Sequence, residues 1–133
     1  MSTVLAGLEP IELDGGGRLP VHIAFRRIGF GGTRILLLHA LTGDPFPEGE
    51  QGYWAPLFQA DAPLDPKSVT VWAPNLPGSC FGSVGPTEVE PFPRITPRDQ
   101  AQALARWIES EDLSFELLLG GSLGGMVALE LAL

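Results

Sequence analysis

The stretch Leu117-Leu118-Leu119-Gly120-Gly121-Ser122-Leu123-Gly124-Gly125-Met126 decides the fold that this sequence predicts. Three leucines lead into a glycine-rich turn around one serine, and a run compatible with a helix follows from Met126 to Leu133. Gly120 to Gly124 fits the pattern G-x-S-x-G, in which a serine occupies a sharp, strained turn between a strand and a helix. Small residues beside the serine avoid collisions with both elements. The pattern makes Ser122 a candidate nucleophile.

The surroundings of Ser122 favour a catalytic interpretation over a structural one. A turn of this kind places the hydroxyl at the N-terminus of the next helix, where backbone N–H groups can receive developing negative charge. The pattern is short, and a chain with 17 glycines can produce it by chance. An inert serine in a glycine-rich turn is therefore the alternative. The apolar strand before Ser122 and the helix after it favour the nucleophile.

Composition and charge describe one globular domain or less, with 133 residues of which 44% are hydrophobic. A net charge of −8 without a basic cluster argues against nucleic-acid binding and supports solubility. No apolar run approaches the roughly 20 residues of a membrane helix, and the N-terminus lacks the features of a signal peptide. The single cysteine allows neither an internal disulfide nor a zinc cluster. We expect a cytoplasmic protein with no membrane contact, no metal and no permanently bound cofactor.

The order of the predicted elements indicates an α/β fold. Residues 1–10 are expected to form an irregular lead-in, and residues 11–133 the core strands and helices of a single domain. The predicted strands are 11–13, 21–25, 35–38, 69–73 and 115–119. The predicted helices are 53–58, 97–110 and 126–133. After an initial hairpin, strands and helices alternate, which is typical of a parallel sheet with helices on its faces.

Two polar loops follow predicted parallel strands, where α/β folds place their ligand sites. His39-Ala40-Leu41-Thr42-Gly43 follows the apolar run at 35–38, and a second loop rich in glycine and serine follows residues 69–73. His22 alternates with apolar residues, so we expect it on the solvated face of an antiparallel edge strand, far from these loops.

Taken together, these segments resemble the homoserine O-acetyltransferase family, an acyltransferase branch of the α/β-hydrolase superfamily. The resemblance is carried by three blocks, Leu38–Gly43, Ala73–Pro86 and Gly120–Glu130, and it extends from about Leu13 to the last residue. It implies an α/β-hydrolase-type, mostly parallel sheet with flanking helices that is truncated after the nucleophile turn. The chain would be the N-terminal part of one such domain.

The resemblance implies a specific reaction, which is transfer of acetyl from the co-substrate acetyl-CoA to L-homoserine, an early step toward methionine. Ser122 would carry the acetyl group, and the backbone N–H groups of Leu41 and Leu123 would form the oxyanion hole. Asn75 and Gly78 would line the mouth of the site.

His39 and Cys80 have alternative roles to weigh. For His39, which precedes the oxyanion loop, we expect side-chain hydrogen bonds that hold the loop, rather than the role of catalytic base. For Cys80, a buried or semi-buried structural cysteine is favoured over a thiol nucleophile.

The catalytic triad is incomplete within these residues. In this superfamily the acid and the histidine follow the serine, whereas His22 and His39 both precede Ser122. We therefore expect the isolated chain to have little or no transferase activity. The strand before Ser122 is expected to be an open apolar edge, and Leu129, Leu131 and Leu133 to lack part of their cover. A complementing C-terminal chain or a homodimer would supply the missing contacts.

Two other functions stay open. A serine carboxylic-ester hydrolase would use the same scaffold and nucleophile. A non-catalytic remnant or interaction module would instead bind a partner strand along the open edge. A succinyl donor or a serine acceptor would leave this part of the chain almost unchanged, so the identities of donor and acceptor rest on resemblance.

Overall fold

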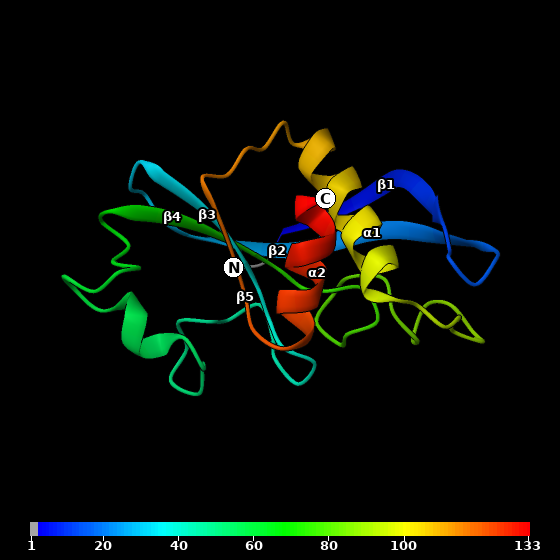
Figure 1. Cartoon of the computed structure of the whole chain (residues 1–133). Helices are drawn as coiled ribbons and strands as arrows, with labels where there is room; N and C mark the ends of the chain where they lie inside the picture. Colours follow the sequence, from blue (N-terminus) through cyan, green and yellow to red (C-terminus); the bar gives the residue numbers. More distant parts are fainter. Residues whose placement is uncertain (1–2) are drawn as a thin grey trace.

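The computed structural model describes the backbone of residues 3–133 and the side chains from residue 7 onward (Figure 1). The strands are β1 (Thr3–Glu12), β2 (Arg18–Gly29), β3 (Thr33–Leu38), β4 (Val69–Pro74) and β5 (Leu117–Gly120). The helices are the 3-10 helix η1 (Ala55–Phe58) and the α-helices α1 (Pro97–Ser110) and α2 (Leu123–Ala132). None of the helices between residues 3 and 133 has the length and apolar character needed to cross a membrane.

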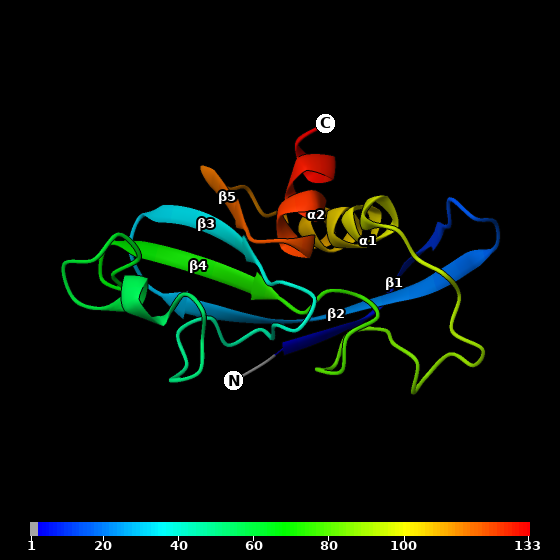
Figure 2. The same ribbon diagram turned by 60° about the horizontal axis from the view of Figure 1, so that its bottom comes forward.

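The five strands form one mixed sheet in the order β1-β2-β4-β3-β5. β3 lies between β4 and β5 and is parallel to both, whereas β2 is antiparallel to β1 and β4. The predicted hairpin and the parallel strands that follow it are thus confirmed. The crossovers bring the carboxyl ends of β3, β4 and β5 to one edge of the sheet (Figure 2).

The first strand begins earlier than expected. Residues 1–10 were predicted to be irregular, but residues 3–10 belong to β1, and residues 1–2 lie outside the described part of the chain. β1 pairs with β2, and its register shifts between Leu5 and Leu8 and again between Leu8 and Ile11. Gly7 lies within the first of these shifts and has a φ of +77°. A glycine with positive φ accommodates a bulge without ending the strand. Gly7 therefore lies at a bulge within β1.

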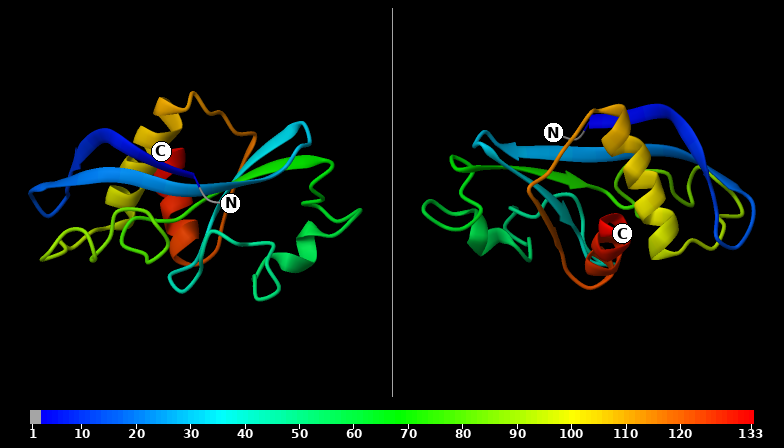
Figure 3. Two further views of the ribbon diagram at one scale, coloured as in Figure 1. Left: turned by 180° about the vertical axis from the view of Figure 1, so that it is seen from behind. Right: turned by 45° about the horizontal axis from the view of Figure 1, so that its top comes forward.

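Alternate side chains of the strands bury the two faces of the sheet in two apolar clusters. Leu36, Leu38 and Trp72 point toward α1 and α2, where they pack around the fully buried Trp107. Ile35 and Leu37 point to the opposite face, toward η1 and Phe58. The two α-helices lie side by side on the first face (Figure 3). The predicted helix at 53–58 forms only as the four-residue η1.

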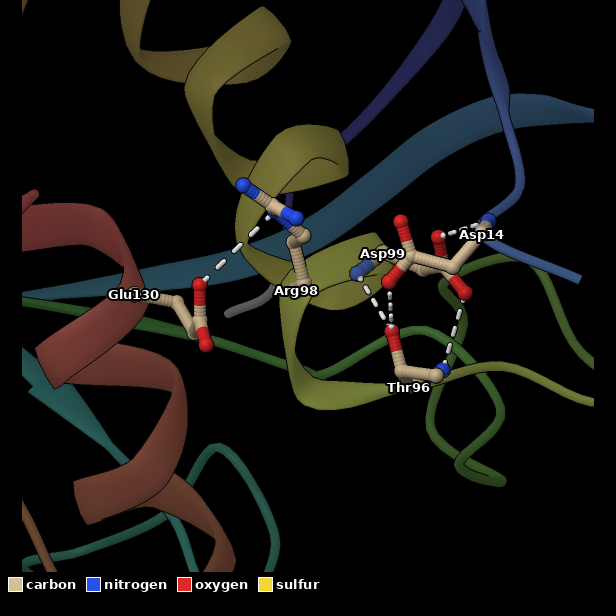
Figure 4. A network of polar contacts seen from close by, with 5 residues as sticks. All are labelled: Asp14, Thr96, Arg98, Asp99 and Glu130. Carbon is tan, nitrogen blue, oxygen red and sulfur yellow. Dashed lines mark hydrogen bonds and ion pairs between the residues drawn. The ribbon is translucent and has the colours of Figure 1, made fainter.

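A polar network fixes the start of α1 (Figure 4). The Asp99 amide donates to Thr96 Oγ1 at 3.1 Å, and the Thr96 amide donates to Asp99 Oδ2 at 2.9 Å, which completes the predicted capping box. Asp99 Oδ1 also accepts from the Asp14 amide at 2.9 Å. The turn between β1 and β2 is thereby attached to the helix. Arg98 Nε and Glu130 Oε2 lie 4.0 Å apart, and this ion pair links α1 to α2 at the surface.

Candidate active site

Ser122 occupies a strained turn between β5 and α2. Its φ of 54° and ψ of −121° lie in a region that non-glycine residues rarely adopt. The flanking glycines make the turn possible, because a Cβ on Gly120 would overlap the Gly124 carbonyl. A Cβ on Gly124 would overlap the backbone carbonyls of Leu38 and His39. The predicted strand–turn–helix is confirmed, and the Ser122 side chain is exposed.

The loop at residues 39–43 leaves the sheet beside this turn. Leu38 is the register partner of Gly120, so β3 and β5 end at the same level. The loop closes on itself through a bond of 2.9 Å from the Gly43 amide to the Ala40 carbonyl. The carbonyls of Leu38 and His39, where this loop begins, lie directly against Gly124.

His39 is buried and holds this loop through both ring nitrogens. Nε2 lies 2.9 Å from the Leu76 amide, which can only donate, so Nε2 is the acceptor. Nδ1 therefore carries the proton and donates to the Ala40 carbonyl at 2.7 Å. Burial lowers the pKa of His39, which favours this neutral form. The predicted loop-holding role is confirmed, and neither nitrogen is free to act as a base.

His22 lies elsewhere, on β2, with its Nε2 2.9 Å from Glu88 Oε2. The expectation of a solvated edge strand is wrong in two respects. β2 pairs with β1 on one side and with β4 on the other, so it is an interior strand. The His22 side chain is also half-buried against the loop that contains Glu88. The structure does not bring it to Ser122.

A first cavity of about 450 Å³ opens beside Ser122. It lies between the 39–43 loop and the segment that leads into η1. Its side chains include one carboxylate, Asp44, together with aromatic groups from that segment. The lining residues used below are His39, Thr42, Asp44, Phe46, Trp54 and Ser122.

A second cavity of about 530 Å³ lies on the other side of the same loop. Thr42 and Gly43 line both cavities, so the loop is the wall between them. Leu41 and Leu123, the two residues expected to supply the oxyanion hole, both line the second cavity. The far wall is formed by the loop after β4 and the segment before α1.

Residues 35–133 match the model of the Alpha/beta hydrolase family. The chain belongs to the alpha/beta hydrolase family. The resemblance to homoserine O-acetyltransferases is confirmed as well. This hydrolase-family chain is 39% identical to the homoserine O-acetyltransferase of Thermobifida fusca, over 93% of the chain and 38% of that relative. It is 37% identical to the homoserine O-acetyltransferase of Trichormus variabilis, over 93% of the chain and 38% of that relative.

Solved structures agree with this assignment of the alpha/beta hydrolase fold. The homoserine O-acetyltransferase of Staphylococcus aureus superposes with a TM-score of 0.81 at 27% identity, covering 98% of this chain and 41% of that one. Esterase E22, solved as an L374D mutant, gives a TM-score of 0.77 at 20% identity over 96% of this chain and 42% of that one, which supports the fold alone. The chain spans less than half the length of these relatives.

Of the two residues expected at the mouth of the site, Gly78 lines the second cavity. Asn75 is fully buried, with 0% of its surface exposed, and lines neither cavity. The backbone N–H of Asn75 donates to the Ala24 carbonyl at 2.8 Å, and the backbone carbonyl of Asn75 accepts from Ser83 Oγ at 2.6 Å. Asn75 thus still pairs with the sheet in this alpha/beta hydrolase, and the loop opens only after it.

The expectation that Cys80 is a buried or semi-buried structural cysteine is wrong. Its side chain is exposed and lines the second cavity. The loop after β4 extends away from the core at this point, which leaves the thiol uncovered. No group of three or more potential metal ligands occurs in the part of this alpha/beta hydrolase that the structure describes.

Sequence reasoning missed the outer wall of the first cavity, which includes Asp44 and Phe46. This wall follows an irregular path that no periodic pattern marks. Arg26 on β2 anchors it, since its guanidinium pairs with the Glu48 carboxylate and lies 4.6 Å from the centre of the Phe46 ring. It also lies 3.4 Å from the Pro45 carbonyl. Arg26 and Glu48 are 22 residues apart in the sequence, so no local pattern marks their pairing.

Proposed function

We propose that this protein takes part in acyl transfer from acetyl-CoA to the hydroxyl of L-homoserine, through an acyl group carried on Ser122. The strained Ser122 turn, packed against the 39–43 loop at the carboxyl edge of the sheet, is the observation that carries the proposal. The activity named for the relatives supports the choice of substrates. The chain would act as the N-terminal part of a cytoplasmic enzyme of methionine synthesis.

The proposed first step forms an ester on Ser122. Its Oγ attacks the thioester carbonyl, the carbon–sulfur bond breaks, and CoA leaves as the thiol with the proton that the serine lost. In the second step the homoserine hydroxyl attacks the ester carbon, the bond between that carbon and Ser122 Oγ breaks, and Ser122 recovers a proton in exchange for the one that the homoserine hydroxyl loses. The amides of Leu41 and Leu123 would stabilise the oxyanion in both steps, and losing one such donor costs about 3–4 kcal/mol of transition-state stabilisation.

The proton transfers need a base that neither histidine provides. His39 uses both ring nitrogens to hold the loop, and His22 lies against Glu88. An unactivated serine is a poor nucleophile near neutral pH. We propose that the base comes from a complementing C-terminal chain, and that the 133-residue chain by itself forms little or no acetyl-serine.

A complementation experiment tests this function. The chain would be co-expressed with the C-terminal remainder of the Thermobifida fusca relative, and the purified complex supplied with acetyl-CoA and L-homoserine. We expect O-acetyl-L-homoserine from this complex and none from the Ser122→Ala version. A complex that forms but yields no product with intact Ser122 would contradict the proposal.

The exposed position of Ser122 favours a second candidate, a serine ester hydrolase, in which water replaces the acceptor hydroxyl. The same complex distinguishes the two. A hydrolase releases acetate at a rate that does not depend on homoserine, whereas the transferase diverts the acetyl group to the amino acid.

A further inference from the structure

We propose that a third cavity, at the end of the sheet opposite Ser122, is a second binding site, in which Arg27 and Arg34 bind a small oxyanion with two negative charges. A dicarboxylate and a phosphate group share this chemistry. The inference goes beyond the proposed function, because neither arginine lines the cavities beside the 39–43 loop.

The third cavity has a volume of about 500 Å³ and lies where β3 and β4 begin. Arg34 and Thr70, which are register partners near the starts of these strands, both line it. Ser122 lies beyond the other end of β3, and the strand separates the two places by about 13 Å at a rise of about 3.3 Å per residue. The third cavity shares no lining residue with the first or the second.

Two arginines pack on one aromatic ring in this cavity. Arg27 on β2 is the register partner of Trp72, and its guanidinium carbon lies 5.1 Å from the centre of the Trp72 ring. The guanidinium carbon of Arg34 on β3 lies 4.9 Å from the same centre. The two cations are therefore at most about 10 Å apart. Packing on the ring restricts both side chains, so a ligand that contacts both needs to order little more of them.

Neither guanidinium is neutralised within the fold. No carboxylate of residues 7–133 lies within 4 Å of the guanidinium nitrogens of Arg27 or Arg34. The Glu116 carboxylate accepts a hydrogen bond from the backbone N–H of Arg34 instead. Arg34 Nε is buried and has no hydrogen-bond partner among these residues. Buried polar groups normally have a partner, so this arrangement indicates one that residues 7–133 do not supply.

The charges that line the third cavity match a small oxyanion. A guanidinium group presents parallel N–H donors that pair with two oxygens of a carboxylate or a phosphate group. The lining contains these two cations and one acid, Glu111, although the chain as a whole has a net charge of −8. Glu111 is exposed at the end of α1, where water and salt screen its charge. The cavity is thus locally cationic on an acidic protein, which concentrates anions there.

Titration of the 133-residue chain with succinate and with inorganic phosphate tests the site. Ionic strength and chloride concentration are held constant, so general screening does not change during the titration. We expect saturable shifts of the Trp72 indole N–H resonance and of the amides of residues 31–34 and 111–113, with smaller shifts at residues 39–44. Acetate, which carries a single charge, should bind at least about fivefold more weakly than succinate.

Arginine variants show whether the two guanidinium groups bind the ligand. We expect the Kd for the tighter-binding dianion to rise at least about fivefold in Arg27→Gln and in Arg34→Gln. Arg106→Gln is the matched control, since it removes an exposed charge from α1 outside the three cavities, and should change the Kd less than about twofold. The Arg27 side chain is exposed, so its replacement keeps the test valid even if Arg34→Gln fails to fold.

An acidic variant gives an effect of the opposite sign. Glu111→Gln should lower the Kd about two- to threefold, because it removes the one acid from the lining. Glu109→Gln removes the same charge from an exposed residue that lines none of the three cavities, and its effect should be smaller. A higher Kd in Glu111→Gln would show that a cationic group of the ligand faces this acid, and would overturn the assignment to an anion.

The two probes also distinguish the sources of the oxyanion. Tighter binding of phosphate than of succinate would assign the site to a phosphate group, and the reverse order would assign it to a dicarboxylate. Shifts that do not saturate with either probe, equal affinity for acetate and succinate, or an unchanged Kd in Arg27→Gln would each overturn the proposal.

Discussion

At the scale of single residues, the backbone of Ser122 and the ring of His39 set the geometry of the candidate site. Ser122 adopts dihedral angles that cost a non-glycine residue about 1–3 kcal/mol. Both ring nitrogens of His39 form hydrogen bonds with neighbouring backbone groups. One residue stores strain and the other fixes the adjacent loop, so each has an effect on stability that can be measured without any substrate.

Replacing Ser122 should stabilise the fold only when the new residue relieves the strain. We expect Ser122→Gly to raise the free energy of unfolding by about 1 kcal/mol relative to Ser122→Ala, because only glycine adopts this conformation without steric cost. Urea denaturation of the two variants measures the difference. Equal stabilities would show that the turn is not strained at this residue.

Stability should fall in mild acid because His39 is neutral in the folded chain. Its pKa is lowered by burial, so between the ordinary pKa of about 6.5 and the lowered folded value the unfolded chain binds a proton that the folded chain does not. The free energy of unfolding therefore decreases as the pH falls through this window, by at most about 1.4 kcal/mol per pH unit. Above pH 7 the contribution is complete.

Denaturant titrations of the chain and of His39→Gln at several pH values between 5 and 8 check this prediction. The variant should be less stable at pH 8, and the difference from the unmodified chain should shrink as the pH falls. A difference that stays constant with pH would show that His39 does not titrate on unfolding.

At the scale of elements, α2 lies unusually close to the end of β3, and Gly124 permits this contact. We expect Gly124→Ala to destabilise the chain by at least about 2 kcal/mol, because its Cβ would overlap the carbonyls of Leu38 and His39. Gly125→Ala is the matched control, since its Cβ would lie 3.3 Å from the nearest atom, the Gly120 carbonyl oxygen. Thermal unfolding compares the two variants, and similar losses would contradict the close packing.

Elements with strong local signals were predictable from sequence, and those shaped by distant contacts were not. The Thr96–Asp99 capping box and the apolar runs of β3 and β4 encode their own structure, so α1 and the parallel strands form where expected. Gly7 is different, because a glycine can either end a strand or lie within a β-bulge. Only the pairing of β1 with β2 decides between these two structures.

In the candidate site, too, some residues were predictable from local sequence and others depend on distant contacts. Ser122 and its glycines follow from a local steric requirement, so they could be identified from their spacing together with the apolar run before them and the helix-compatible run after them. The burial of Asn75 depends on pairing with Ala24 of β2, and the wall that contains Asp44 and Phe46 depends on Arg26. Both depend on contacts across the fold that no local pattern reports.

At the scale of the whole molecule, β5 is the last strand of the sheet, with β3 on one side and no described strand on the other. Leu117 on β5 is 45% exposed, and Leu129 on α2 is 70% exposed. The expected open apolar edge is therefore present. Exposed backbone groups along such a strand are a template for pairing with another chain.

We expect the isolated chain to self-associate at micromolar concentrations through this edge, and Leu117→Lys to reduce the association. Phe30→Lys is the control, because Phe30 is 76% exposed but lies at the end of β2, away from β5. Sedimentation velocity measures the change. If both lysine variants shift the distribution equally, total hydrophobicity rather than the edge drives association.

The close packing around Ser122 also bears on the order in which such an enzyme is assembled. The close contacts at Gly120 and Gly124 that this turn requires involve Leu38, His39 and the first turn of α2, all within residues 33–132. A nascent chain would therefore set its nucleophile during synthesis, before any later segment emerged. We expect the strained conformation of Ser122 to be in place before any partner binds, so that the partner adds groups for proton transfer and covers the open edge without reshaping the turn.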